Sequence, residues 1–356
     1  MSAGPTLVLA TGGTGGHVFP ALAVAEAAQR DGVTVLVLGQ RGGMEERLSA
    51  EAGVPFHGVS AGKWHRGRPS PRQALQAAAG VVEAWQLLRR QRPKVVVGFG
   101  GFASYPGAFA ATRLGIPLAL HEGNAYPSQV NRWLAGSAAL LILAQEQALQ
   151  HLPRARRSVS IPFPVRERRV DRGAARAAFG LEADAVVTLV MGGSQGSATL
   201  NTAVPQSFSS LAERFTSLSV LHSAGRGRSD AVSVAQELRG RYQVVDFLDA
   251  ATAWATADMA ITRAGVGTLS EAAFNGVPLL MVPLPSSAED HQLHNAMAVA
   301  EAGAGIVVEE RDLAGLTAAW EALLDPPTRQ AAAAAATART PVGAARRILE
   351  AVMELK

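Results

Sequence analysis

The feature that most constrains this chain is a pattern that occurs twice: an apolar strand, a glycine-rich turn and a helix. The first copy spans residues 6–30 and turns at residues 11–20, and the second starts with residues 185–191 and turns at residues 192–197. Each copy is the first unit of a doubly wound parallel sheet, whose glycines let the backbone approach a ligand at the helix start. The repetition therefore predicts an α/β protein with two Rossmann-like, doubly wound domains that face each other across a cleft.

The length of the chain agrees with two domains, because 356 residues exceed one ordinary core. Residues 161–166 read Ile-Pro-Phe-Pro-Val-Arg, a stiff connector with little helix potential. We therefore predict an N-terminal domain over residues 1–163 and a C-terminal domain over residues 164–341. An amphipathic helix over about residues 342–356 is expected to pack back on the N-terminal domain.

Several classes of site are excluded or disfavoured by composition. The chain has no cysteine, which excludes disulfides, thiolate metal sites and cysteine nucleophiles. The first glycine turn lacks the Lys-Ser/Thr of a P-loop and the later acidic residue of a typical NAD site, so ATP hydrolysis and hydride transfer are disfavoured. There is no Asp-x-Asp pair, and we expect no metal and no cofactor.

The apolar runs and the charge distribution of the chain indicate where the protein is located and which surface it meets. No apolar run reaches the length of a membrane span, and no secretory signal is recognisable at the N-terminus, so we expect a cytoplasmic protein. Residues 1–168 carry 18 Lys and Arg against 9 Asp and Glu, whereas the remainder carries 15 against 20. A basic N-terminal half favours a polyanionic partner, most naturally an anionic membrane surface.

Nucleic acid is the competing partner for this basic half. Aromatic residues make up only 5% of the chain, and no zinc-finger, RRM-like or helix-turn-helix pattern is present, so we expect no nucleic-acid binding. The basic, proline-containing residues 63–72 precede a helix predicted over residues 73–90 that carries Trp85. This combination is typical of a surface that docks on lipid headgroups, although cations in the last turn also suit the helix dipole alone.

The segment of residues 258–296 carries the strongest indication of chemistry. A buried strand leads into Gly265 and Gly267, and Thr268 or Ser270 is expected to cap a helix that begins at Leu269. The first N–H groups and the positive dipole end of that helix would face an anion. Glu271, which we expect in the first turn, suits the vicinal hydroxyls of a ribose.

Two amides follow on the next helix. Gln292 and Asn295 lie three residues apart, a spacing suited to two hydroxyls of one sugar ring. Taken singly, each amide could equally be solvated, and Glu271 could serve only the helix dipole. The ordered set nevertheless predicts a sugar-nucleotide pocket.

Three further candidate residues lie in the N-terminal half. His17 ends the first glycine turn, where a neutral imidazole near a helix N-terminus can act as a base, or can simply hydrogen-bond the loop. Glu122 and Asn124 follow a strand predicted over residues 117–121. In open α/β sheets ligands bind at such strand ends.

Five stretches together resemble one family. They read ATGGTGGHVFPALAVA from Ala10, VGFGGFASYPG from Val97, HEGNAYPSQVNRWLA from His121, VMGGSQGSATLN from Val190, and RAGVGTLSEAAFNGVPLLMVP…DHQLHNA from Arg263. In this order they resemble the MurG family, the N-acetylglucosaminyltransferases of peptidoglycan precursor synthesis, which have the GT-B fold. The resemblance covers nearly the whole chain.

The resemblance implies a hexosyltransferase that moves GlcNAc from UDP-GlcNAc to the 4-hydroxyl of the MurNAc of lipid I, which yields lipid II with inversion. It implies a peripheral protein at the cytoplasmic face of the cell membrane. Donor contacts from the N-terminal domain are implied for Thr14, Gly15, Gly16 and Asn124. The implied UDP-sugar pocket consists of Arg166, Ser194, Leu248, Val266, Gly267, Thr268, Leu269, Ser270, Glu271 and Gln292, with Asn295 near the sugar. For the general base, His17 is the first choice and Glu122 the second.

Some positions depart from the family pattern. Gly123 and Ser128 stand where the family has Gln and Gly, and Phe163 replaces an Asn of the linker. These changes fall on the acceptor side and the hinge, and two alternatives stay open. One is a UDP-GlcNAc 2-epimerase, and the other is a non-catalytic protein that binds a UDP-sugar or recruits partners to a membrane.

Overall fold

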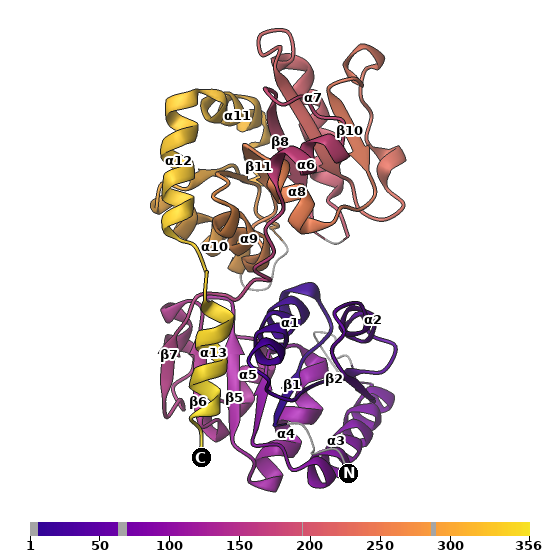
Figure 1. Ribbon diagram of the computed structural model, residues 1–356, viewed down its shortest axis with the longest axis vertical. Coiled ribbons are helices and arrows are strands. Elements are labelled where there is room, and N and C mark those ends of the chain that lie inside the picture. Colours follow the sequence, from indigo (N-terminus) through magenta and orange to yellow (C-terminus); the bar gives the residue numbers. More distant parts are fainter. Residues whose placement is uncertain (1–5, 63–69, 194, 286–289) are drawn as a thin grey trace. The chain divides into compact units, whose positions relative to one another are not determined.

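The computed structural model describes residues 6–62, 70–193, 195–285 and 290–356 (Figure 1). The chain forms two compact units. Residues up to Arg166 and residues Pro341–Lys356 make the N-terminal unit, and Glu167–Thr340 make the C-terminal unit. Each unit is an α/β domain around a parallel sheet, which confirms the predicted fold class of two doubly wound domains.

In the N-terminal unit the described residues form seven strands in the order β3-β2-β1-β4-β5-β6-β7. Their bounds are β1 Leu7–Ala10, β2 Val35–Gln40, β3 Phe56–Val59, β4 Val95–Gly98, β5 Leu118–Glu122, β6 Leu140–Leu143 and β7 Ser158–Ser160. The order reverses between β1 and β4, where Ala10 pairs with Gly98. A ligand site is expected beyond the carboxyl ends of the strands at such a reversal.

Helices cover both faces of this sheet. They are α1 Gly15–Arg30, α2 Met44–Glu51, α3 Pro71–Gln91, α4 Tyr105–Leu114, α5 Gln129–Leu134 and α13 Ala344–Met353. Leu7 and Leu9 of β1 point into a core shared with α1 and α13, whereas Val8 points into the core beneath α3 and α4. This alternation follows from the period of two along a strand, so a strand buried on both faces is apolar throughout.

The start of α1 differs from the prediction. We expected the helix to begin at Ala21, after Pro20, but it begins at Gly15 with Thr14 as its N-cap. The N–H groups of His17 and Val18 already bond to the carbonyl of Thr14. Pro20 therefore lies inside the helix, and the glycine turn is shorter than predicted. As a result Gly15, Gly16 and His17 form the first turn of α1.

In the C-terminal unit the described residues form six parallel strands in the order β10-β9-β8-β11-β12-β13. Their bounds are β8 Val186–Met191, β9 Leu218–Ser223, β10 Tyr242–Val245, β11 Met259–Thr262, β12 Leu279–Met281 and β13 Gly305–Val307. The helices are α6 Arg172–Ala178, α7 Ala198–Leu211, α8 Ala250–Thr256, α9 Val266–Asn275, α10 His291–Glu301, α11 Leu316–Leu324 and α12 Pro326–Ala338. Residues of α7 and α11 share one core, and residues of α8, α9 and α10 share the other.

Between β9 and β10 the chain forms the short 3₁₀ turns Ser229–Ala231 and Gln236–Leu238. The carboxylate of Asp246 accepts hydrogen bonds from the backbone N–H groups of Gly227, Arg228 and Ser229, at 2.9, 3.2 and 2.9 Å. This long-range anchor holds the segment as a turn. No helix in the described part of the chain combines the length and apolarity needed to cross a membrane.

Candidate functional site

Two glycine turns meet at the strand reversal of the N-terminal unit. Gly12 and Gly101 follow the adjacent strands β1 and β4, and both have positive φ angles, 143° and 75°. A Cβ atom on Gly101 would lie 2.5 Å from the carbonyl oxygen of Gly12. The turns therefore pack backbone against backbone, and only glycine fits at this contact.

His17 lies beside these turns. Its Nδ1 atom is 2.9 Å from the hydroxyl oxygen of Thr14, and a Cβ on Gly100 or Gly101 would come within 3.1 and 3.2 Å of its ring. When Nδ1 carries the proton and donates it to Thr14, Nε2 holds the lone pair that a general base needs. The structure thus brings together the predicted residues Thr14 and His17.

Glu122 ends β5 and is 3% exposed. Its Oε1 accepts hydrogen bonds from the backbone and side-chain N–H groups of Asn124 at 3.0 and 3.3 Å. Its Oε2 accepts from the Ser128 backbone at 2.7 Å and from the Asn131 side chain at 2.9 Å. Burial raises the pKa of Glu122, and the four hydrogen bonds, which a carboxylate can accept together, oppose that rise. This side chain anchors the loop that leads into α5.

His121 is buried beneath the same region. Its ring packs between Phe99 and Phe163, with ring centroids at 5.2 and 5.6 Å. Burial and, to a smaller extent, the neighbouring His17 together lower the pKa of His121 to about 3, so the ring stays neutral at physiological pH. Phe163, a departure from the family pattern, therefore serves to cover a neutral imidazole.

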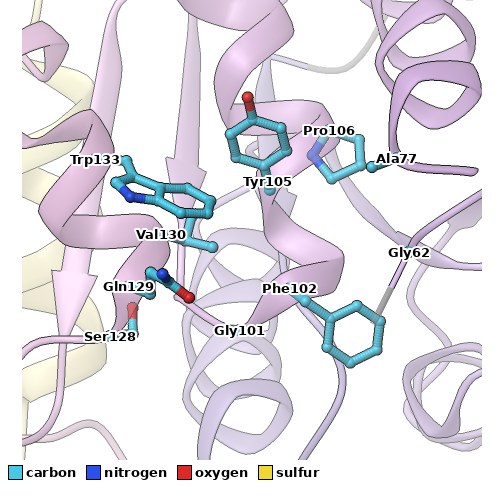
Figure 2. A pocket seen from close by; sticks show the side chains of 10 residues that line it. All are labelled: Gly62, Ala77, Gly101, Phe102, Tyr105, Pro106, Ser128, Gln129, Val130 and Trp133. Atoms are coloured by element: carbon cyan, nitrogen blue, oxygen red, sulfur yellow. The ribbon is translucent and has the colours of Figure 1, made fainter. Parts of the chain in front are cut away.

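A cavity of about 210 Å³ adjoins the His17 and Glu122 region (Figure 2). Its lining residues are Gly62, Ala77, Gly101, Phe102, Tyr105, Pro106, Ser128, Gln129, Val130 and Trp133. Gly101 packs on His17, and Ser128 donates to Glu122, so two lining residues belong to both places. Trp133 is 47% exposed and stands edge-on to Tyr105 at 5.9 Å, which gives the cavity an aromatic wall.

In the C-terminal unit, α9 begins at Val266 with Gly265 as its N-cap, because the Leu269 N–H already bonds to the Gly265 carbonyl at 3.1 Å. The predicted start at Leu269, with Thr268 or Ser270 as the cap, is wrong. Gly265 adopts the extended N-cap conformation itself, and Gly267 is tolerated in the first turn. The N–H groups of the first turn belong to Val266, Gly267 and Thr268, and N–H groups at a helix start suit an anion.

This earlier start moves Glu271 into the second turn of α9 rather than the first. Its Oε2 accepts a hydrogen bond from the indole N–H of Trp254 at 2.9 Å. Burial raises the pKa of Glu271, and the hydrogen bond from Trp254 lowers it in part. Sequence reasoning selected Glu271 but missed Trp254, which lies on α8.

Gln292 and Asn295, on α10, both bind the backbone of Ala264. The Gln292 side-chain oxygen accepts from the N–H groups of Ala264 and Leu284, each at 3.1 Å. The Asn295 side chain donates to the Ala264 carbonyl at 3.3 Å, and Asn295 is 2% exposed. The pair therefore holds the turn before α9 in place. The sequence prediction, that two amides three residues apart bind two hydroxyls of one sugar ring, did not include this role.

The glycine turn that follows β8 in the C-terminal unit packs against a neighbouring loop. A Cβ on Gly196 would lie 1.9 Å from the carbonyl oxygen of Ala224, which also accepts a hydrogen bond from Asn201 at 3.1 Å. Asn201 in turn contacts the buried His222 at 3.1 Å. Ser194, predicted for this turn, lies outside the described residues.

The remaining predicted positions divide into three groups. The side chains of Leu248 and Leu269 belong to the apolar core, so they would reach a ligand only through their backbone. Arg166 forms an ion pair with Glu26 of α1 at 2.5 Å. Val266, Gly267, Thr268 and Ser270 are partly exposed at the start of α9.

Comparisons with known proteins show the family of this chain. Two family models, described as Glycosyltransferase family 28 N-terminal domain and Glycosyltransferase family 28 C-terminal domain, match residues 7–141 and 187–347. The chain belongs to glycosyltransferase family 28. A protein of Deinococcus deserti is 46% identical over 373 aligned residues, which cover 97% of each chain. A protein of Thermus thermophilus is 42% identical over 303 residues, 85% of this chain and 87% of that protein.

Both relatives of this family 28 chain carry the name UDP-N-acetylglucosamine--N-acetylmuramyl-(pentapeptide) pyrophosphoryl-undecaprenol N-acetylglucosamine transferase. The solved structure of MurG from Acinetobacter baumannii is 28% identical, covers 98% of this chain and 99% of its own, and superposes with a TM-score of 0.76. The resemblance to the MurG family is thereby confirmed. A UDP complex of MnaA from S. aureus, 15% identical with a TM-score of 0.68 over 97% and 95% of the two chains, shares the fold alone.

Proposed function

We propose that this family 28 chain transfers GlcNAc from UDP-GlcNAc to the 4-hydroxyl of the MurNAc of lipid I and so forms lipid II. The observation that carries the proposal is the donor-type site of the C-terminal unit, in a chain that matches the transferases named above over almost its whole length. That site combines the α9 helix end with a carboxylate one turn later. It suits the diphosphate and ribose of a UDP-sugar.

The donor would bind as follows. Its diphosphate takes hydrogen bonds from the N–H groups of Val266, Gly267 and Thr268, and the helix dipole favours the negative charge. Glu271 accepts hydrogen bonds from the ribose hydroxyls. The Ala264 turn, held by Gln292 and Asn295, keeps the helix end in register with β11.

Inversion requires one displacement. The acceptor 4-hydroxyl attacks the anomeric carbon, and the bond from that carbon to the β-phosphate oxygen of UDP breaks as the new C–O bond forms. The proton of the hydroxyl passes to Nε2 of His17, and the charge on the leaving UDP is stabilised by the α9 N–H groups. When Nδ1 of His17 donates to the Thr14 hydroxyl, Nε2 keeps the lone pair that takes this proton.

Glu122 suits a supporting role better than that of the base. Its two oxygens already accept four hydrogen bonds, which hold Asn124 and the start of α5 beside His17. Although burial raises the pKa of Glu122, protonation would break at least one of these bonds, and the four bonds leave no acceptor position for a substrate hydroxyl. We therefore assign proton removal to His17 and loop positioning to Glu122.

The acceptor and the membrane would meet the N-terminal unit. The aromatic cavity in Figure 2 shares residues with the His17 region and so suits part of the acceptor. Helix α3 exposes Leu75 at 72% and Val82 at 54%, and Arg89 lies over the Trp85 ring at 5.1 Å. Apolar and basic side chains on one helix favour an anionic membrane surface at the cytoplasmic face, rather than nucleic acid. Residues 63–69 of the basic segment lie outside the described residues.

A transfer assay tests the proposed reaction. Purified protein is incubated with labelled UDP-GlcNAc and a short-chain lipid I analogue in the presence of a chelator, and labelled lipid II is expected. Release of a 2-epimerised sugar in the absence of acceptor would indicate an epimerase instead. UDP binding without product from any lipid acceptor would indicate a non-catalytic binding protein.

The membrane proposal has its own test. Co-sedimentation with vesicles is expected to increase with the fraction of anionic lipid and to decrease with salt. Replacement of Leu75 and Val82 by Ser should weaken sedimentation without altering UDP binding. Sedimentation that ignores lipid charge would remove the electrostatic part of the proposal.

A further inference from the structure

The buried indole of Trp254 connects the core of the C-terminal unit to Glu271. Trp254 is 2% exposed and lies in α8, among the apolar residues that also include Leu248 and Leu269. Its position is set locally, because Asp249 caps α8 by accepting the Thr252 N–H at 3.1 Å. The indole N–H then reaches Oε2 of Glu271 at 2.9 Å. A core residue is thus bonded directly to the carboxylate of the donor-type site.

The geometry of this bond restricts the carboxylate. An indole N–H can only donate, so the bond requires an acceptor oxygen and favours the ionised form of Glu271. Because Oε2 is engaged, the rotation of the carboxylate about its last torsion is limited, and Oε1 is the oxygen left for other donors. Among the described residues no other side chain or backbone N–H donates to this carboxylate.

We propose that Trp254 is a positioning residue of the donor site, which holds one oxygen of Glu271 so that the other faces the vicinal hydroxyls of the nucleotide ribose. The inference rests on the proposed function, because it takes Glu271 as the ribose acceptor. Trp254 itself does not touch the substrate. Its contribution is the orientation and charge of the group that does.

Electrostatics support the same role. Burial raises the pKa of Glu271, and the hydrogen bond from the Trp254 indole opposes this rise. Without the indole N–H the carboxyl would be protonated over a wider pH range, and one of its oxygens would become a donor. A site that must accept hydrogen bonds from two hydroxyls then loses acceptor capacity.

The test compares two ligands in two matched variants. Isothermal titration of the full-length protein with UDP and with 2′,3′-dideoxyuridine diphosphate measures how strongly the site recognises the ribose hydroxyls. Trp254→Phe keeps an aromatic ring in the core and removes the donor. Trp320→Phe is the control, because Trp320 is equally buried in the same unit and its indole N–H donates to Thr188 at 3.1 Å, with no bond to Glu271.

We expect Trp254→Phe to weaken UDP binding about tenfold and to leave binding of the dideoxy ligand nearly unchanged. Trp320→Phe should keep the wild-type preference for UDP, even if it lowers the unfolding temperature. In the transfer assay Trp254→Phe should raise KM for UDP-GlcNAc and leave kcat close to its original value. Equal weakening of both ligands, or an unchanged preference for UDP, would overturn the proposal.

Two further measurements keep the result unambiguous. If Trp254→Phe does not fold, 3-benzothienylalanine at position 254 replaces the N–H by sulfur in nearly the same shape, and the same loss of preference is expected. In a Glu271→Gln background, removal of the indole donor should have no further effect on the preference. Failure of the wild-type protein itself to distinguish the two ligands would refute the ribose role of Glu271, whereas discrimination that survives in Trp254→Phe would refute only the role of Trp254.

Discussion

Two carboxylates, one in each unit, are held in opposite ways: Glu122 is the last residue of β5, and Glu271 lies in α9, the helix after β11. Glu122 in the N-terminal unit accepts four hydrogen bonds and is almost fully buried. Glu271 in the C-terminal unit accepts one, from Trp254, among the described residues. A saturated carboxylate organises the protein around it, whereas one with remaining acceptor capacity can organise a ligand. The comparison separates a carboxylate that holds the protein structure from one that can bind a ligand.

The largest expected effect concerns His17, the group beside the saturated carboxylate. His17→Ala should lower kcat about 100- to 10,000-fold, because a positioned base is removed from the displacement. UDP affinity should stay within about twofold of the wild type, since the donor site lies in the other unit. The check is steady-state transfer kinetics together with titration of UDP. Equal loss of kcat and UDP affinity would place His17 in the binding site instead.

Glu122 and Glu271 should differ in what their removal costs. Glu122→Ala takes the acceptor from the partly buried N–H groups of Asn124 and Ser128 and one of two acceptors from the buried Asn131 amide, and it should lower the free energy of unfolding by about 3 kcal/mol. Glu271→Ala leaves one buried donor, the Trp254 indole N–H, without its acceptor, so it should lower the free energy of unfolding by only about 1 kcal/mol, and it should also weaken UDP binding. Urea unfolding followed by circular dichroism measures the first quantity. Similar destabilisation by both substitutions would remove the distinction between the two carboxylates.

The contact between the glycine turns of the N-terminal unit can be tested with a matched pair. Gly101 and Gly115 have similar positive φ angles, 75° and 68°, but only at Gly101 would a Cβ meet another atom, the Gly12 carbonyl oxygen at 2.5 Å. Both Ala substitutions carry a backbone cost of about 1 kcal/mol. Gly101→Ala should cost about 2 kcal/mol more and lower kcat as His17 shifts. Equal unfolding free energies for the two variants would show that the turns do not need this contact.

The smallest expected effect is on the pH dependence of donor binding. Burial raises the pKa of Glu271, so the carboxylate that accepts from the ribose is lost as pH falls through that raised value, and UDP affinity should fall with it. The change is expected to be about three- to tenfold. Glu271→Gln has no such titration, and its UDP affinity should be flatter with pH. Calorimetric titrations between about pH 4.5 and 8 compare the two proteins.

Local sequence patterns predicted most of the strands and helices and the order of the candidate sites. Buried parallel strands are continuous apolar runs, and glycine turns mark their ends, so both signals lie within a few residues of the element they specify. The same local logic misplaced the starts of α1 and α9. In each case a glycine that we assigned to a turn belongs to the first turn of the helix, with the N-cap at Thr14 or Gly265.

Contacts between distant residues decided what each candidate side chain does. Glu122 became an anchor because Asn131, nine residues away on α5, turns toward it, and Asn295 became one because it reaches back to Ala264 across 31 residues. Trp254 and Glu271 lie 17 residues apart on different helices, and no spacing rule joins them.

Residue types and periodicity determined which elements form and which chemistry the chain carries, since propensity, turn formation and apolar alternation act over a few residues. Which polar atoms are satisfied by the protein and which remain for a ligand was decided only by tertiary packing. A hydrogen bond between two side chains depends on where separate helices place them, to within a fraction of an ångström.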